Sequence, residues 1–151
     1  MPPAPNSTRL DRAAETCAAR GAQLTALRRE VLRLVLEADG PVTAYQLLDR
    51  LRQVRAGAVP PTVYRALDFL LAQGLIHRIE RLNAFVACPE SDHQHAAQFL
   101  ICRRCGTVVE LDDTIVARAL DAAARRQGFH PAHAVVEIEG LCAACASSVM
   151  L

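Results

Sequence analysis

The sequence predicts an α+β fold in two parts. Helical periodicity followed by a hairpin pattern occupies the first half of the 151 residues, and strand patterns with two cysteine pairs occupy the second half. We expect an N-terminal domain over residues 1–88, a polar connector over 89–96 and a smaller C-terminal domain over 97–151. Residues 1–8 contain three prolines and are expected to form a disordered leader.

The first half contains four helical patterns and two strand-like runs. Thr25 and Thr43 are favourable N-cap residues, Pro60 and Pro61 open the fourth helix, and Gly74 ends it. The predicted helices cover Leu10 to Arg20, Thr25 to a stop at Asp39, Thr43 to about Val54, and Val63 to Gln73, and the predicted strands cover Leu75 to Glu80 and Ala84 to Ala87. Helices followed by a hairpin in this order are typical of a winged helix-turn-helix.

In a winged helix-turn-helix, the helix that begins near Thr62 would enter the DNA major groove. Arg65 has the planar fork needed to contact a guanine edge, and Tyr64 and Thr62 could touch phosphates or sugars. Tyr45, in the preceding helix, could reach a thymine methyl group or the backbone. The alternatives are a solvated helix face for Arg65 and core packing for the two tyrosines. Further candidates for phosphate contact are Arg28, Arg29, Arg78 and Arg81.

The charge distribution supports a polyanion partner on the N-terminal side. The net charge is +1, but residues 1–88 carry 12 Arg against 8 Asp and Glu, whereas the remainder carries 5 Arg against 8 acids. Aromatic residues make up 4% of the chain and Trp is absent, which disfavours stacking on single-stranded nucleic acid. No apolar run approaches a membrane span, and the N-terminus does not resemble a signal peptide. We therefore expect a soluble, cytoplasmic protein.

Four of the six cysteines form two CxxC pairs, which predict a zinc site. Cys102 and Cys105 form the first pair, Cys142 and Cys145 form the second, and 36 residues lie between the pairs. Four thiolates supply the tetrahedral set that zinc prefers. The alternatives are two reactive dithiols or free core cysteines. A thioredoxin-like site would need a CxxC that opens a helix, whereas the first pair follows a strand pattern.

The residues between the cysteine pairs predict a small α/β unit. Strand patterns flank the first pair, and Asp112-Asp113-Thr114 begins a helix that ends at Gln127-Gly128. A further strand pattern leads to Gly140 and the second pair. The predicted strands cover Phe99 to Ile101, Thr107 to Leu111 and Ala134 to Ile138.

A second metal site is predicted where the two halves join. His77 and Cys88 lie on the two strands of the predicted hairpin, and His95 and Glu110 flank the first CxxC turn. One thiolate, two imidazoles and a carboxylate form a set that suits zinc, and His93 could replace His95 or Glu110. An ion held by residues of both halves would set the angle between them. It would thereby couple metal binding to the spacing of two recognition helices in a dimer.

Four stretches of the chain together resemble the ferric uptake regulator family, and within it the zinc-responsive branch. These stretches are Pro60-Pro61-Thr62-Val63-Tyr64-Arg65-Ala66-Leu67-Asp68-Phe69-Leu70, Gly74-Leu75-Ile76-His77, Phe99-Leu100-Ile101-Cys102-Arg103-Arg104-Cys105-Gly106 and Gly140-Leu141-Cys142-Ala143-Ala144-Cys145. The resemblance implies a homodimeric repressor with a C-terminal dimerisation domain. Such a repressor would bind an AT-rich palindromic double-stranded DNA operator when zinc is plentiful and release it when zinc is scarce. Its targets would be zinc-uptake genes.

The same resemblance assigns roles to individual residues. It implies two zinc ions per chain, and it assigns base contact to Arg65 and Tyr45. The structural zinc falls on Cys102, Cys105, Cys142 and Cys145, and the regulatory zinc on His77, Cys88, His95 and Glu110.

Three rival functions predict different behaviour. A peroxide, thiol or other-metal sensor of the same family would release DNA in response to a different signal. A zinc deaminase would need His-x-Glu and a Pro before the CxxC, but no His here is followed two positions later by Glu, and Ile101 precedes Cys102. We therefore expect no enzymatic activity and no small-molecule substrate. A metal-storage module would show no sequence-specific DNA binding.

Overall fold

The chain forms two compact units, divided between residues 93 and 94, inside the predicted connector. The computed structural model describes residues 5–88, 97–132 and 134–149. The predicted connector, residues 89–96, lies outside this part of the chain. Within the described residues, no helix has both the length and the apolar character needed to cross a membrane.

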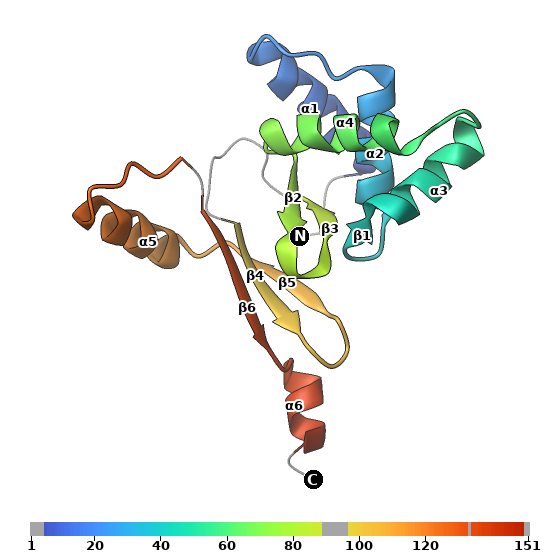
Figure 1. The fold of residues 1–151 in the computed structure, drawn as a ribbon. Coiled ribbons are helices and arrows are strands. Elements are labelled where there is room, and N and C mark those ends of the chain that lie inside the picture. Colours follow the sequence, from blue (N-terminus) through green and yellow to red (C-terminus); the bar gives the residue numbers. More distant parts are fainter. Residues whose placement is uncertain (1–4, 89–96, 133, 150–151) are drawn as a thin grey trace. The chain divides into compact units, whose positions relative to one another are not determined.

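Four helices form most of the N-terminal unit (Figure 1): α1 (Asn6–Ala19), α2 (Ala26–Glu37), α3 (Ala44–Val54) and α4 (Pro60–Ala72). The predicted caps are confirmed, because the Thr25 side chain accepts a hydrogen bond from the Arg28 amide. Thr43 forms a capping box with Gln46, in which each side chain accepts from the backbone of the other residue. These caps fix where α2 and α3 begin.

The N-terminal helix starts earlier than the sequence predicts. α1 begins at Asn6, inside the segment expected to be a disordered leader, and the Arg9 amide donates to the Pro5 carbonyl at 3.1 Å. Pro5 fits this position because it lacks the amide hydrogen that the first turn of a helix leaves unpaired. Residues 6–8 are therefore helical, and residues 1–4 lie outside the described residues.

A three-stranded antiparallel sheet completes the N-terminal unit. It contains β1 (Val42–Thr43), β2 (Ile76–Ile79) and β3 (Ala84–Ala87) in the order β1-β3-β2. A 3₁₀ turn, η1 (Glu80–Leu82), joins β2 to β3, and Asn83 follows it with φ +48°. Asparagine tolerates this left-handed conformation better than most residues. The hairpin prediction is confirmed, whereas the two-residue β1 was too short to give a sequence pattern.

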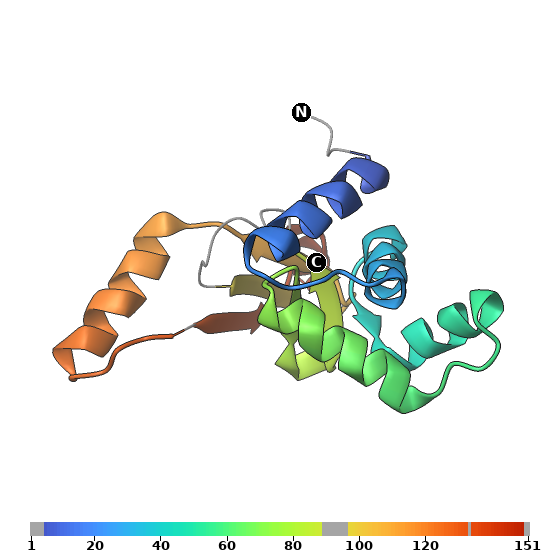
Figure 2. The same cartoon turned by 90° about the horizontal axis from the view of Figure 1, so that it is seen from above.

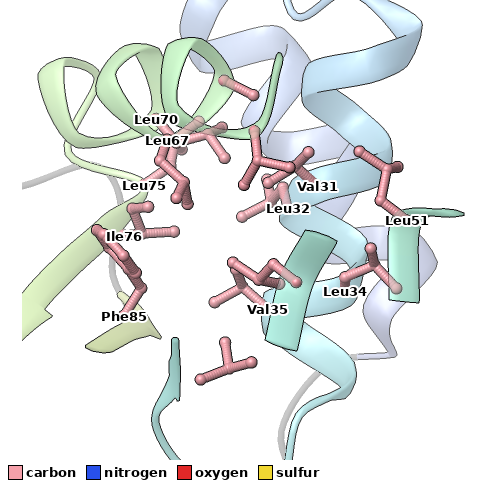
Figure 3. Close-up of a cluster of buried hydrophobic side chains, with 14 of the residues drawn as sticks. Val31, Leu32, Leu34, Val35, Leu51, Leu67, Leu70, Leu75, Ile76 and Phe85 are labelled. Atoms are coloured by element: carbon pink, nitrogen blue, oxygen red, sulfur yellow. The ribbon is translucent and has the colours of Figure 1, made fainter. Parts of the chain in front are cut away.

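One hydrophobic core joins the helices to the hairpin (Figure 3). Leu67 and Leu70 on the inner face of α4 are buried to 1% exposure or less, and Ile76 begins β2 beneath them. The core residues labelled in Figure 3 are Val31, Leu32, Leu34, Val35, Leu51, Leu67, Leu70, Leu75, Ile76 and Phe85. Because the apolar face of α4 packs in the core, its opposite face is available for other contacts. The N-terminal unit is thus a winged helix-turn-helix.

The C-terminal unit contains a second three-stranded sheet, in the order β5-β4-β6. β4 (Ala97–Cys102) pairs antiparallel with β5 (Val108–Leu111) and parallel with β6 (Val135–Gly140). The crossover between β5 and β6 carries α5 (Thr114–Arg126), which Asp113 caps by accepting hydrogen bonds from the Ile115 and Val116 amides. The last element of the described residues is α6 (Ala143–Val149), a helix that the sequence patterns do not predict.

Candidate metal sites and nucleic-acid interface

The structure brings the four paired cysteines together in the C-terminal unit. Their sulfur atoms all lie within 4.8 Å of one another, and Cys105 Sγ is 3.7 Å from Cys142 Sγ. A tetrahedral zinc ion with Zn–S bonds of about 2.3 Å places its sulfur ligands about 3.8 Å apart. The observed separation therefore fits four thiolates around one zinc ion.

Parallel pairing of β4 with β6 places the two pairs side by side. Cys102 ends β4, and its register partner Gly140 ends β6, two residues before Cys142. The Arg103 amide donates to the Gly140 carbonyl at 2.9 Å, which extends the pairing to the first CxxC turn. Gly106 takes φ +77°, a conformation that costs glycine little, and so turns the chain back into β5.

The second CxxC pair opens a helix, unlike the first. Cys142 directly precedes α6 and its carbonyl accepts from the Ala146 amide at 2.8 Å, while Cys145 lies in the first turn. Arg104 Nη1 donates to Ser148 Oγ at 2.7 Å, joining the first CxxC turn to α6. The cluster is therefore held by backbone pairing on one side and by α6 on the other.

Different hydrogen bonds to the sulfur atoms separate the pKa values of the thiols. Backbone amides, first that of Cys105 and then that of Cys142, donate to the Cys102 sulfur and lower the pKa of this thiol to about 6. The Thr107 hydroxyl, 3.0 Å from Cys105 Sγ, lowers the pKa of Cys105. Hydrogen bonding to Cys142, followed by burial, raises the pKa of Cys145 to about 12. Without a cation the cluster retains protons at neutral pH, and a divalent ion would displace them.

In the N-terminal unit, two of the four residues predicted for the second metal site lie together. His77 is on β2, and Cys88 directly follows β3, where its amide donates to the Leu75 carbonyl at 3.0 Å. The Cys88 sulfur and an imidazole nitrogen of His77 lie within 4.8 Å of each other. Glu110 is on β5 of the C-terminal unit, and His93 and His95 lie outside the described residues. The hairpin register thus supplies a neighbouring thiol and imidazole.

The residues predicted to contact DNA are exposed on α3 and α4. Tyr64 and Arg65 lie on the outer face of α4, opposite its buried leucines, and Tyr64 is 52% exposed. Tyr45, in the first turn of α3, is 75% exposed, so neither tyrosine packs in the core. Thr62 is half-buried near the start of α4. Within the described residues, the Arg65 guanidinium makes no hydrogen bond or ion pair and is available to a ligand.

Several other arginines have partners inside the protein, which the sequence could not reveal. The Arg28 guanidinium lies 3.8 Å from the centroid of the Phe69 ring on α4 and donates to the Gln23 carbonyl. Arg20 donates to the Gln73 carbonyl at the end of α4, at 2.6 Å. Both contacts anchor the C-terminal end of α4 to the rest of the N-terminal unit. Two of the remaining phosphate candidates are also paired, Arg29 with Asp11 at 2.7 Å and Arg78 with Asn83 at 2.8 Å.

Comparison with known proteins shows similarity over most of the chain. The profile of the ferric uptake regulator family matches residues 19–139. The zinc uptake regulation protein of Escherichia coli K12 is 47% identical over 137 residues, which cover 90% of this chain and 80% of the relative. The zinc uptake regulation protein of Mycobacterium tuberculosis H37Rv is 30% identical over 132 residues, covering 85% and 98% of the two chains.

Solved structures give the same result for the fold. A zinc uptake regulator complexed with zinc and DNA superposes with a TM-score of 0.87 at 43% identity, covering 98% of this chain and 99% of that one. The crystal structure of holo XcZur superposes with a TM-score of 0.81 at 48% identity, covering 95% and 99% of the two chains.

Proposed function

This chain belongs to the ferric uptake regulator family, and from that premise we propose that it is a zinc-sensing transcriptional repressor acting in the cytoplasm. The zinc-loaded homodimer binds a palindromic operator and represses zinc-uptake genes, and loss of zinc from the regulatory site releases the DNA. The observation that carries this proposal is the match, over nearly the whole chain, to a zinc uptake regulator bound to zinc and DNA. The family consists of regulators, so the chain is not an enzyme.

In this proposal, the four paired cysteines hold a structural zinc ion. A closed set of four thiolates leaves no open coordination position, which suits a permanent structural role better than sensing. The ion would lock the ends of β4 and β6 to α6. Because such a site forms only in the folded chain, metal binding there contributes to folding free energy.

A second zinc ion would be the regulatory one, for a total of two per chain. We assign it to His77, Cys88, His95 and Glu110. Support comes from the proximity of the His77 imidazole and the Cys88 thiol, because a soft thiolate favours zinc over iron. His77 and Cys88 belong to the N-terminal unit and Glu110 to the C-terminal unit, so the bound ion would couple the two. Coupling of this kind is reciprocal: operator binding also strengthens zinc binding.

The proposed DNA contacts lie on the helix-turn-helix. Arg65 would contact a base edge in the major groove, with Tyr45 as a second base contact and Thr62 and Tyr64 touching the backbone. Their exposure and the free guanidinium support this assignment. The contacts that Arg28 and Arg20 make with α4 would keep the helix in a fixed orientation.

Residues 97–151 are proposed to form the dimerisation domain. α5 contributes no buried residue, although its sequence is amphipathic, and it stands apart from the sheet of its own unit (Figure 1). Ile115 on α5 is 78% exposed and Ile138 on β6 is 52% exposed. Apolar surface of this kind is usually covered by a partner, and a second copy of the chain would provide the cover.

A zinc-buffered binding series tests the proposal. The probe is a duplex selected from a random library by the zinc-loaded protein, and fluorescence anisotropy measures affinity as free zinc is varied. We expect binding to tighten about 5- to 150-fold as the regulatory site fills. An affinity that does not change with zinc would refute the sensor. Release of DNA by hydrogen peroxide while zinc stays bound would instead indicate the peroxide or thiol sensor of the same family.

A further inference from the structure

The short helix α6 carries the second cysteine pair, but its own packing holds it only weakly. It has seven residues, and none of the side chains from 143 to 148 is buried. It extends beyond the end of β6, and the other helix of this unit, α5, lies away from it (Figure 1 and Figure 2). Isolated helices shorter than about 12 residues are marginal in water, because the first turn is costly to form. α6 therefore depends on tethers at specific points.

Arg104, in the first CxxC turn, provides such a tether at the far end of α6. Its guanidinium donates from Nη1 to Ser148 Oγ at 2.7 Å, and the Ser148 hydroxyl donates to the Cys145 carbonyl at 2.8 Å. A serine hydroxyl can accept and donate at the same time, so the two hydrogen bonds form a relay. The Arg104 amide also donates to the Cys102 sulfur. Arg104 is thus bonded to the first cysteine pair directly and to the second pair through Ser148.

Resting on the structural zinc ion of the proposed function, we propose that Arg104 and Ser148 form a latch that slows the loss of zinc from the four-cysteine site. Cys142 directly precedes α6 and Cys145 lies in its first turn, so movement of α6 away from the sheet would remove two of the four ligands together. The latch ties the opposite end of α6 to the first CxxC turn. Residues that orient metal ligands through hydrogen bonds typically change metal affinity about 10- to 100-fold when they are replaced.

The latch has a consequence for sensing, because it gives the two proposed zinc sites different exchange rates. Cys102 is buried but Cys105 is exposed, so a competing ligand can approach the cluster from solvent. Rapid loss of this ion would disorder the C-terminal unit whenever free zinc falls. With the latch closed, the structural ion stays bound while the regulatory site empties. The response of DNA binding to zinc then depends on the regulatory ion alone.

The rate at which Co²⁺ leaves the full-length protein tests the latch. The parent protein carries Cys88→Ser, which removes the thiol of the regulatory site, and the one cysteine then outside the cluster is Cys17, buried in α1. Co²⁺ bound to thiolates absorbs visible light, so mixing the Co²⁺-loaded protein with excess EDTA gives the release rate. We expect Arg104→Ala and Ser148→Ala each to release Co²⁺ about 10-fold faster than the parent. This is the low end of the range because both side chains are exposed.

Two comparisons separate the latch from charge and from helix stability. Arg103→Ala removes the same charge one position away, and within the described residues the exposed Arg103 side chain makes no hydrogen bond or ion pair, so this variant should release Co²⁺ at the parent rate. Ser148→Ala raises helix propensity, so its faster release would not come from a weaker helix. The double variant of Arg104 and Ser148 should release Co²⁺ no faster than either single variant, because each change breaks the same relay.

Three results would overturn the inference. The first is release at the parent rate from both single variants. The second is equal acceleration by Arg103→Ala, which would assign the effect to charge and not to the hydrogen bond. The third is additive acceleration in the double variant, which would show that Arg104 and Ser148 act independently. A parent protein that binds no Co²⁺ through thiolates would instead refute the structural metal site of the proposed function, a result distinct from these three.

Discussion

Replacing Arg65 by alanine should weaken binding to the selected duplex without destabilising the protein. The side chain is exposed and its guanidinium has no partner among the described residues, so the free energy of unfolding should change by no more than about 0.5 kcal/mol. A bidentate contact to guanine is worth about 1–3 kcal/mol of discrimination, which is about 5- to 150-fold in affinity per half-site. A symmetric dimer makes the contact twice, so the loss should reach about 2–6 kcal/mol.

The assay is fluorescence anisotropy on the selected duplex and on a scrambled duplex of the same length, at several salt concentrations. Two controls isolate the base contact. Arg65→Lys keeps the charge but lacks the planar fork, and it should recover little of the lost specificity. Arg50→Ala removes one exposed charge from α3 and should leave specificity intact. Equal losses on both duplexes, or full recovery with lysine, would show that Arg65 contacts phosphate and would refute the assignment.

The remaining predictions concern metal, pH and the fold. Cys88→Ser should abolish the response of DNA binding to zinc and leave a folded dimer. Cys105→Ser should instead lower the thermal midpoint or unfold the chain. Indistinguishable melting curves would contradict the division into a regulatory and a structural zinc site. Purified protein should hold two zinc ions per chain by atomic absorption, falling to one after mild chelation. In zinc-free protein, thiolate absorbance near 240 nm should begin to rise near pH 6, below the pH at which an ordinary thiol ionises. Because the folded pKa of Cys102 is lowered, its contribution to stability is present above pH 9 and lost as the pH falls through about 6. Thr43→Ala should cost about 1 kcal/mol in urea unfolding, and Thr43→Ser should cost less.

Local physical chemistry determined much of this protein from sequence alone. The caps at Thr25 and Thr43 and the break at Gly74 marked helix ends within a few residues, because capping depends on backbone geometry within one turn. The CxxC pairs predicted a zinc site because a two-residue spacing suits two thiolates on one ion. The wing hairpin followed from two short apolar runs around a turn, and its register placed the Cys88 thiol near the imidazole of His77.

Only the tertiary structure decided how distant segments meet. Parallel pairing of β4 with β6 brings together cysteine pairs that are 36 residues apart, and nothing in either pair encodes that register. The contact of Arg28 with Phe69 depends on helix packing, which joins residues with no periodic relationship in the sequence. The sequence also did not predict that α1 begins at Asn6, because the proline-rich segment before Leu10 has no apolar periodicity. Only the packed structure shows that Leu10 is buried in the core.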